Sequence, residues 1–265
     1  SIVALGLGLS LTQVARTGFE SLSVTLVTVS AAFLAAGLLG RALGIPSKLK
    51  LLIGVGTAIC GGSAIAAVTP IVKADEHDTA FAISTIFLFN LVAVLAFPLL
   101  GHLLGLSDRG FGLWAGTAIN DTSSVVAASY SYAQQAGDVA TITKLARTTM
   151  IVPIALGFAL LVARRARPAN DPDADGEAAG FSFVRIFPWF VLGFLAMALL
   201  NSFGVLGATA PRFSLAGKLL ITVALAGVGL GANLRKIVRT GPRPILLGLV
   251  VWVAVALISL GVQSV

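Results

Sequence analysis

The chain has 265 residues, of which 57% are hydrophobic and only 11% are charged, and its mean hydropathy is +0.98. Soluble domains carry roughly a quarter of charged residues, so this composition excludes a soluble globular protein. The formal net charge of +7 does not indicate nucleic-acid binding, because the Lys and Arg residues lie in short loops between apolar runs.

The apolar runs predict a polytopic, all-α membrane protein. Each run suits a helix that crosses the hydrocarbon layer, which takes about 20 residues, and none alternates like a strand. Helices also satisfy their own backbone in lipid, as isolated strands cannot. We expect about nine membrane segments, the first one partial: Ser1–Leu11, Leu22–Leu43, Leu49–Val72, Thr79–Leu104, Phe111–Gln134, Val139–Val162, Phe183–Leu206, Ser214–Asn233 and Ile245–Val265.

The beginning of the chain and one linker bear on the domain organisation. The sequence opens at Ser1 inside an apolar run and without an initiator Met, so we expect N-terminal helices to be missing. The only long connection, Arg164–Gly180, is rich in Pro, Asp and Gly and is expected to be a solvated linker. We therefore expect a single transmembrane domain over 1–265, with a core bundle around 49–72 and 111–134 and a scaffold of the remaining helices.

The Lys and Arg residues predict an orientation in the membrane. When the loops are assigned alternately to two sides, twelve of the eighteen basic residues fall on one side. Cytoplasmic loops carry an excess of these residues, so the richer side is expected to be cytoplasmic.

Two short stretches of sequence recur. Gly56–Val68 and Gly116–Ala128 agree at six of thirteen positions, beginning with the same Gly-Thr-Ala-Ile, and Gly6–Gly18 and Gly229–Gly241 agree at seven of thirteen. Six predicted membrane segments lie between the members of the second pair, so they enter from opposite sides. Inverted repeats of this kind are typical of secondary transporters.

The first pair of stretches can be oriented in two ways. If both segments cross the membrane, the single helix between them makes them parallel. If each is a re-entrant hairpin, turning at Cys60–Gly62 and Asn120–Thr122, they are antiparallel. Hairpins would move Lys73 and Arg109 to opposite sides without changing the charge count, so crossing and re-entrant helices both stay open.

Both stretches interrupt an apolar segment with small and polar residues. An interrupted helix leaves backbone N–H and C=O groups unpaired, which a membrane tolerates only where they face protein or a watery cavity. The half-helices that begin near Ser63 and Ser123 would point N–H groups and a partial positive charge at an anion. Close helix packing by the small residues is the alternative. The expected substrate-binding residues are Thr57, Cys60, Gly61, Gly62, Ser63, Thr117, Asn120, Thr122 and Ser123.

Asp121 is the strongest single candidate for a residue that binds a coupling ion. A carboxylate near the middle of a membrane costs several kcal/mol, and such groups usually lie on proton or ion pathways. We expect Asp121, with Asn120, to hold a coupling ion, either Na⁺ or H⁺. The alternative is an N-cap for the half-helix that follows, and one residue can fill both roles.

Other polar residues carry weaker signals. Lys144 and Arg147 begin a predicted segment, where snorkelling at a helix end accounts for them as well as attraction of an anion does. His77 and His102 are too far apart in sequence to indicate a metal site with Cys60, so we expect no metal and no cofactor beyond the coupling ion.

With these motifs, the sequence resembles a bacterial family of membrane proteins described as sulfate exporters. The likeness covers nearly the whole chain and is strongest in Gly56–Glu76, Gly116–Ala128, Lys144–Leu156 and Phe187–Ser202. Members of that family carry His-Glu where this chain has Asn120 and Asp121, so an acid is kept and an imidazole is lost. More distantly, the sequence is similar to the bile-acid sodium symporter fold, in which two crossing, unwound helices frame the substrate.

The resemblance implies a secondary active transporter of a small anion, such as a sulfate-like oxyanion or a small organic acid. Coupling to Na⁺ or H⁺, an elevator-type motion and a multi-pass location in the bacterial inner membrane are expected with it. An anion channel is one alternative. An intramembrane enzyme is another, with less support, because a nucleophile such as Cys60 would need a partnered base. The expected partners are the small anion and membrane lipid, with no nucleic acid; a homodimer is left open.

Overall fold

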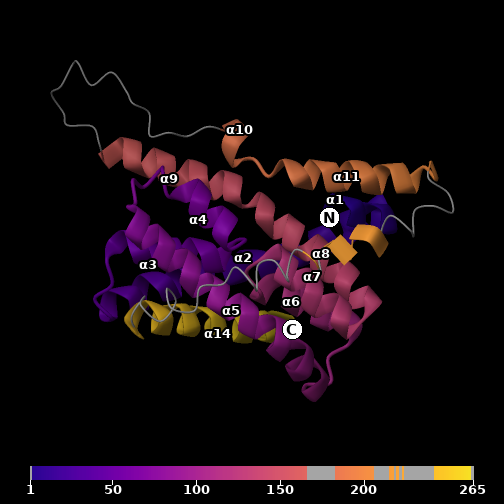
Figure 1. The fold of residues 1–265 in the computed structure, drawn as a ribbon, viewed down its shortest axis with the longest axis horizontal. Coiled ribbons are helices and arrows are strands. Elements are labelled where there is room, and N and C mark those ends of the chain that lie inside the picture. Colours follow the sequence, from indigo (N-terminus) through magenta and orange to yellow (C-terminus); the bar gives the residue numbers. More distant parts are fainter. Residues whose placement is uncertain are drawn as a thin grey trace.

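The computed structural model describes residues 2–165, 183–205 and 242–263, with a few positions between 215 and 223. The described residues form helices joined by short turns, as expected for an all-α protein (Figure 1). Most of the predicted segment Ser214–Asn233, nearly all of the linker Arg164–Gly180 and the whole second copy Gly229–Gly241 lie outside the described residues, so the longer repeat is not tested.

Four of the described helices are long and apolar enough to cross a membrane. They are α2 (Leu11–Ala42), α5 (Glu76–Leu103), the pair formed by α8 (Gln134–Thr149) and α9 (Ile151–Arg165) over Gln134–Val162, and α14 (Pro242–Gln263). Large apolar side chains lie exposed on their outer faces, among them Leu38 of α2 and Leu95 of α5. Lipid would cover such faces in a membrane protein.

Helix α2 corrects one expected boundary. The sequence placed a membrane segment at Leu22–Leu43, but the helix already begins at Leu11. The hydroxyl of Ser10 caps it by accepting a hydrogen bond from the backbone N–H of Gln13, and Arg16 pairs with Glu20 one turn later. These polar contacts extend the helix beyond the apolar window from which the segment was predicted.

The N-terminal residues and the segment after the linker pack together. Helix α1 (Ile2–Leu5) and a short 3₁₀ turn, η1 (Gly6–Gly8), lie against α11 (Trp189–Ser202), which follows α10 (Phe183–Ile186). The amide of Asn201 donates to the carbonyl of Leu9, and the hydroxyl of Ser202 accepts from the N–H of Leu11.

The expected segment Leu49–Val72 is a helical hairpin. Helix α3 (Ser47–Ala58) ends at a tight turn, and α4 (Gly62–Val68) runs back beside it, so that Gly56 of α3 lies against Ile65 of α4. At the open end, Lys48 Nζ donates to the carbonyl oxygen of Lys73 over 2.5 Å. The two arms therefore begin and end on the same side.

The expected segment Phe111–Gln134 is a second hairpin. Helix α6 (Asp108–Ala118) leads to a turn, and α7 (Thr122–Tyr132) returns along it. At its last residue the ring of Tyr132 stacks on Phe111 at the start of α6, with 3.9 Å between ring centroids, and its hydroxyl donates to the carbonyl of Leu106. Of the two arrangements left open by the sequence, the structure has hairpins, and the crossing helices that the bile-acid symporter likeness favoured are wrong.

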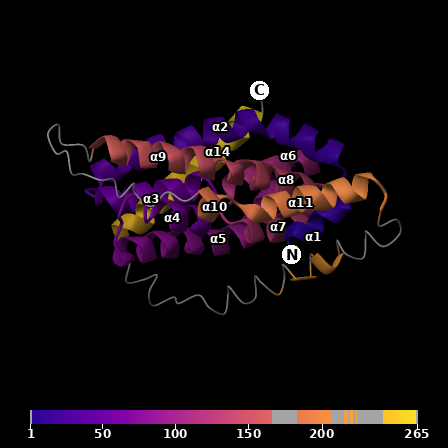
Figure 2. The same cartoon turned by 90° about the horizontal axis from the view of Figure 1, so that it is seen from above.

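The two hairpins enter from opposite ends of the molecule. Helix α5 connects them, beginning beside the first hairpin, where Thr79 contacts Thr69, and ending beside the second, where His102 stacks on Tyr132. In Figure 1, α3 and α4 lie toward the left, α6 and α7 toward the right, and α5 and α14 extend between them. The views of Figures 1 and 2 agree on this order along the long axis.

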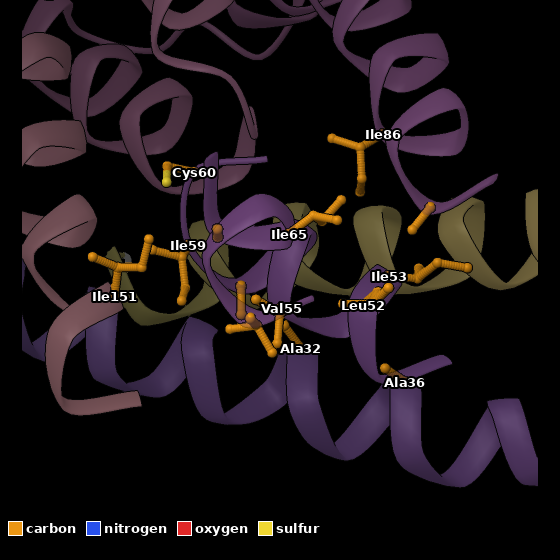
Figure 3. Close-up of a cluster of buried hydrophobic side chains, with 14 of the residues drawn as sticks. Ala32, Ala36, Leu52, Ile53, Val55, Ile59, Cys60, Ile65, Ile86 and Ile151 are labelled. Carbon is orange, nitrogen blue, oxygen red and sulfur yellow. The ribbon is translucent and has the colours of Figure 1, made fainter. Parts of the chain in front are cut away.

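Each hairpin is embedded in its own hydrophobic cluster. Around the first, buried side chains of α3 face small residues of α2 such as Ala32 and Ala36, while Ile65 of α4 lies toward Ile86 of α5 (Figure 3). Around the second, the indole N–H of Trp252 on α14 donates to the carbonyl of Ala118. The surrounding helices thus hold both tips in place.

Candidate functional site

The candidate site lies where the tips of the two hairpins meet. We name Ile59–Gly61 the first tip and Ile119–Asp121 the second tip. A Cβ atom added to Gly61 would lie 3.7 Å from the backbone nitrogen of Asp121. Gly61 has a φ of 69°, in the left-handed region that favours glycine, and this turn brings the two tips into contact.

The predicted site residues are therefore brought together, although not with the geometry expected for all of them. The hydroxyl of Thr57 donates to the carbonyl of Ile53, and that of Thr117 to the carbonyl of Leu113. Both hydroxyl groups are engaged with their own helices, so they do not offer donors to a ligand in this conformation. Helix α4 has only seven residues, so its start carries little of the helix dipole, and the anion-binding role that the sequence suggested near Ser63 stays a prediction.

Lys144 occupies the junction of the two tips. Its side chain is fully buried, and its Nζ donates to the carbonyl oxygens of Ile59 over 2.8 Å and of Ile119 over 2.9 Å. Ile59 and Ile119 are the C-cap residues that directly follow α3 and α6. A helix carries a partial negative charge at its C-terminus, so one ammonium group binds two negative helix ends at once.

Arg147 lies one turn further along α8 and is also fully buried. Its Nε donates to the carbonyl of Ala58 over 2.6 Å and its Nη2 to that of Thr57 over 2.9 Å. Its Nη1 has no hydrogen-bond partner in the described part of the chain. A guanidinium has five N–H donors, so this nitrogen has hydrogen-bonding capacity that the described residues do not use.

The close approach of α6 to α8 depends on Gly116. A Cβ atom there would lie 2.8 Å from Cβ of Thr143 and 2.9 Å from the carbonyl oxygen of Ala140, so a larger residue would push the helices apart. The absence of a side chain at Gly116 thus lets α8 approach closely enough for Lys144, the residue after Thr143, to reach the second tip.

Asp121 has the capping role that was weighed against an ion-coupling role. Its Oδ2 accepts a hydrogen bond from the backbone N–H of Ser124 over 3.0 Å, which caps α7. Its own backbone N–H donates to Oδ1 of Asn90 over 3.1 Å. The carboxylate is at the same tip as Ile119, whose carbonyl oxygen accepts from Lys144. The capping interpretation is confirmed, and a coupling role stays a prediction.

Asn120 is fully buried at the second tip. Neither its amide nitrogen nor its amide oxygen has a partner among the residues that the structure describes. Leaving a buried polar group unpaired costs about 1–3 kcal/mol, so such a group calls for an explanation. A bound ligand would supply it.

A cavity opens beside the first tip. It has a volume of about 560 Å³ and lies between α4, the junction of α8 and α9, and the connection from α10 to α11. Cys60, Ser63 and Thr148 contribute its polar groups, while Ile151 and Phe190 are among its apolar lining residues. Thr148 follows Arg147 on α8, and Cys60 follows closely after Ala58, whose carbonyl oxygen accepts from Arg147 Nε, so the cavity is lined by close sequence neighbours of the residues at this contact.

Sequence reasoning missed the central role of Lys144 and Arg147. They were assigned to a segment end, yet α8 begins at Gln134 and places both residues deep inside the molecule. Their spacing of three residues, which puts two cations on one helix face, was the available signal.

The sequence is similar to uncharacterised bacterial membrane proteins. The family model described as conserved hypothetical protein 698 matches residues 1–248. A UPF0324 membrane protein of Streptococcus pyogenes serotype M18 is 44% identical over 271 residues, covering 99% of this chain and 78% of the relative. One of Clostridium tetani is 39% identical over 269 residues with the same coverage, and one of Fusobacterium nucleatum is 37% identical over 286 residues, covering 100% of this chain and 80% of the relative. No solved structure matches the chain.

Proposed function

We propose that this chain, which belongs to the conserved hypothetical protein 698 family of UPF0324 bacterial membrane proteins, is a secondary active transporter of a small anion. The observation that carries the proposal is the pair of fully buried cations, Lys144 and Arg147, where two interrupted helices meet.

The charge balance at the tips favours an anionic ligand. Lys144 and Arg147 bring two positive charges, and Asp121, two residues beyond the Ile119 carbonyl that Lys144 binds, brings one negative charge. Burying an unbalanced charge costs several kcal/mol, and the carbonyl ends of α3 and α6 offset only part of it. A small anion would complete the balance.

The unpaired donors favour a particular place for the anion. Arg147 Nη1 and the amide nitrogen of Asn120 are the two nitrogen donors among the buried polar atoms that lack a partner in the described residues. We place the anion against these groups, with entry through the cavity beside Cys60 and Ser63. A sulfate-like oxyanion or a small carboxylate or sulfonate suits a guanidinium, which binds such groups through paired hydrogen bonds.

The arrangement of the hairpins supports alternating access. Two hairpins that enter from opposite sides and meet at their tips give each side of the membrane its own gate. In the proposed motion, the core that carries both hairpins moves against a scaffold of other helices, as in an elevator. Transport would be coupled to a gradient of Na⁺ or H⁺, with Asp121 as the candidate group that binds the coupling ion. The protein would lie in the bacterial inner membrane.

An intramembrane enzyme is less well supported. His77 stacks on Phe81 at the start of α5, and His102 stacks on Tyr132 at its end, so each histidine is placed at the base of a hairpin. Cys60, the candidate nucleophile, lies at a tip. Covalent catalysis requires a base partnered with the nucleophile, and histidines at the bases of the hairpins are not placed to partner a cysteine at a tip.

The proposal is tested by a binding screen followed by flux. The purified protein is heated with sulfate, sulfite, small carboxylates and sulfonates, and a bound anion is expected to raise its melting temperature. The stabilising anion is then loaded into proteoliposomes. Saturable uptake that is accelerated by the same anion on the far side supports a carrier; non-saturating flux indicates a channel. If none of these anions binds or moves, the proposed function is wrong.

A further inference from the structure

Lys144 binds the two hairpin tips as a metal ion would. Its Nζ lies 2.8 Å from the carbonyl oxygen of Ile59 and 2.9 Å from that of Ile119, and its side chain is fully buried. The two carbonyls come from opposite hairpins, 60 residues apart in sequence. A single positive charge therefore links the ends of two helices that approach from opposite sides.

Two helix C-termini that point at one place repel each other, because each carries a partial negative charge. In transporters built from interrupted helices, unwound carbonyls and the C-terminal ends of half-helices commonly coordinate Na⁺. An ammonium group also carries one positive charge and binds carbonyl oxygens. The position that a coupling cation would take is thus filled by a side chain of the chain itself.

We propose that Lys144 is a built-in cation that takes the place of Na⁺ between the hairpin tips, so that the assembled site does not require Na⁺. The inference deepens the proposed function and rests on it for its meaning in transport: with the cation position between the tips filled, we take H⁺ at Asp121 as the coupling ion. Arg147 is not an alternative occupant of this position, because its donors reach Ala58 and Thr57 of the first hairpin alone.

A second consequence concerns what happens when Lys144 is removed. Lys144→Ala deletes the charge and leaves the carbonyls of Ile59 and Ile119 facing a small gap. A free monovalent cation can then enter that gap, as can methylammonium, which reproduces the end of the lysine side chain. The variant should become dependent on an added cation that the wild type ignores.

The experiment measures the melting temperature of the purified chain in detergent, in chloride salts of Na⁺, Li⁺, methylammonium or choline at one ionic strength. We expect the wild type to melt at the same temperature in Na⁺ and in choline. We expect Lys144→Ala in choline to melt lower by about 5 °C or more. Na⁺, Li⁺ or methylammonium should restore part of this loss. Lys50→Ala, the same change on the first turn of α3, should show no such restoration.

Two results would overturn the built-in cation. One is a wild type that Na⁺ stabilises by several degrees over choline. The other is a Lys144→Ala protein that none of the small cations stabilises. If that variant does not fold, the wild-type comparison alone decides: equal melting supports the proposal and Na⁺-dependent melting rejects it.

The outcomes separate this inference from the proposed function. The melting experiment contains no candidate substrate anion, so it gives its answer even if no anion is transported. Conversely, Na⁺-dependent melting would reject the built-in cation while leaving anion transport standing. Where flux is found, it should proceed at the same rate when choline replaces Na⁺ on both sides.

Discussion

Lys48 and Lys73 lie at the same end of the molecule, with Nζ of Lys48 bonded to the carbonyl oxygen of Lys73. The two arms of the first hairpin separate them in sequence, so an uninterrupted crossing would have put them on opposite sides of the membrane. At the other end, Arg109 at the base of the second hairpin pairs with Glu20 of α2. The contacts of these residues define the topology.

The topology predicts a pattern of chemical labelling. In a Cys60→Ser background, single cysteines at Lys48 and Lys73 should react with a membrane-impermeant maleimide from one side of sealed vesicles. A cysteine at Arg109 should react from the other side only. Labelling of Lys48→Cys and Lys73→Cys from opposite sides would show that the first interrupted segment crosses the membrane.

The left-handed turn at the first tip predicts a difference between two neighbouring glycines. Gly61→Ala should destabilise the fold by about 1–2 kcal/mol, because an alanine resists a φ of 69°. It would also bring Cβ to 3.3 Å from Ile86. Gly62→Ala, where an added Cβ meets nothing within 4 Å, should be neutral or slightly stabilising in an unfolding titration. Equal losses at both positions would contradict the turn.

Asp121 allows its capping and coupling roles to be separated. Asp121→Asn should keep the cap on α7 and the thermal stability, whereas Asp121→Ala should lose about 1 kcal/mol. If the carboxylate also carries the coupling proton, Asp121→Asn should exchange anion across the membrane but no longer concentrate it in response to a pH gradient. A variant that still accumulates anion to the wild-type level would limit Asp121 to capping.

Alanine substitutions at Asn120 and Asn90 should have different effects on the stability of the ligand-free protein. Asn120→Ala removes an unpaired buried amide, so the ligand-free protein should be as stable as the wild type or gain up to about 1 kcal/mol, while stabilisation by the anion should shrink. Asn90→Ala removes the acceptor for the N–H of Asp121 and should destabilise the ligand-free protein. Melting curves with and without anion test both; a marked loss of ligand-free stability in Asn120→Ala would contradict the unpaired amide.

Much of the site could be predicted from its local sequence. Gly61 and Gly62 after an apolar run, and Asp121 followed by hydroxyl residues, have the residue types of a helix end and a helix start, so both interruptions were found at their correct places. The membrane class followed from hydropathy alone. These features depend on neighbouring residues, which the sequence displays directly.

The remaining features depend on distant contacts. Hairpins and crossing helices give the same count of basic residues on each side, so Lys73 and Arg109 could not decide between them. The role of Lys144 depends on carbonyls that belong to Ile59 and Ile119, 85 and 25 residues away. A hydropathy profile places Lys144 near a segment boundary, because charge lowers the local average whether or not the side chain is buried.

The central claim is that the guanidinium of Arg147 binds the transported anion. The most direct test is uptake by proteoliposomes of the anion found in the screen, comparing wild type, Arg147→Lys and the exposed control Arg164→Lys. Both substitutions keep the charge, but lysine cannot reproduce the fork of donors that includes Nη1. We expect Arg147→Lys to raise the half-saturating anion concentration about tenfold or more, and Arg164→Lys to leave it unchanged. An unchanged half-saturating concentration and maximal rate in Arg147→Lys would contradict the account.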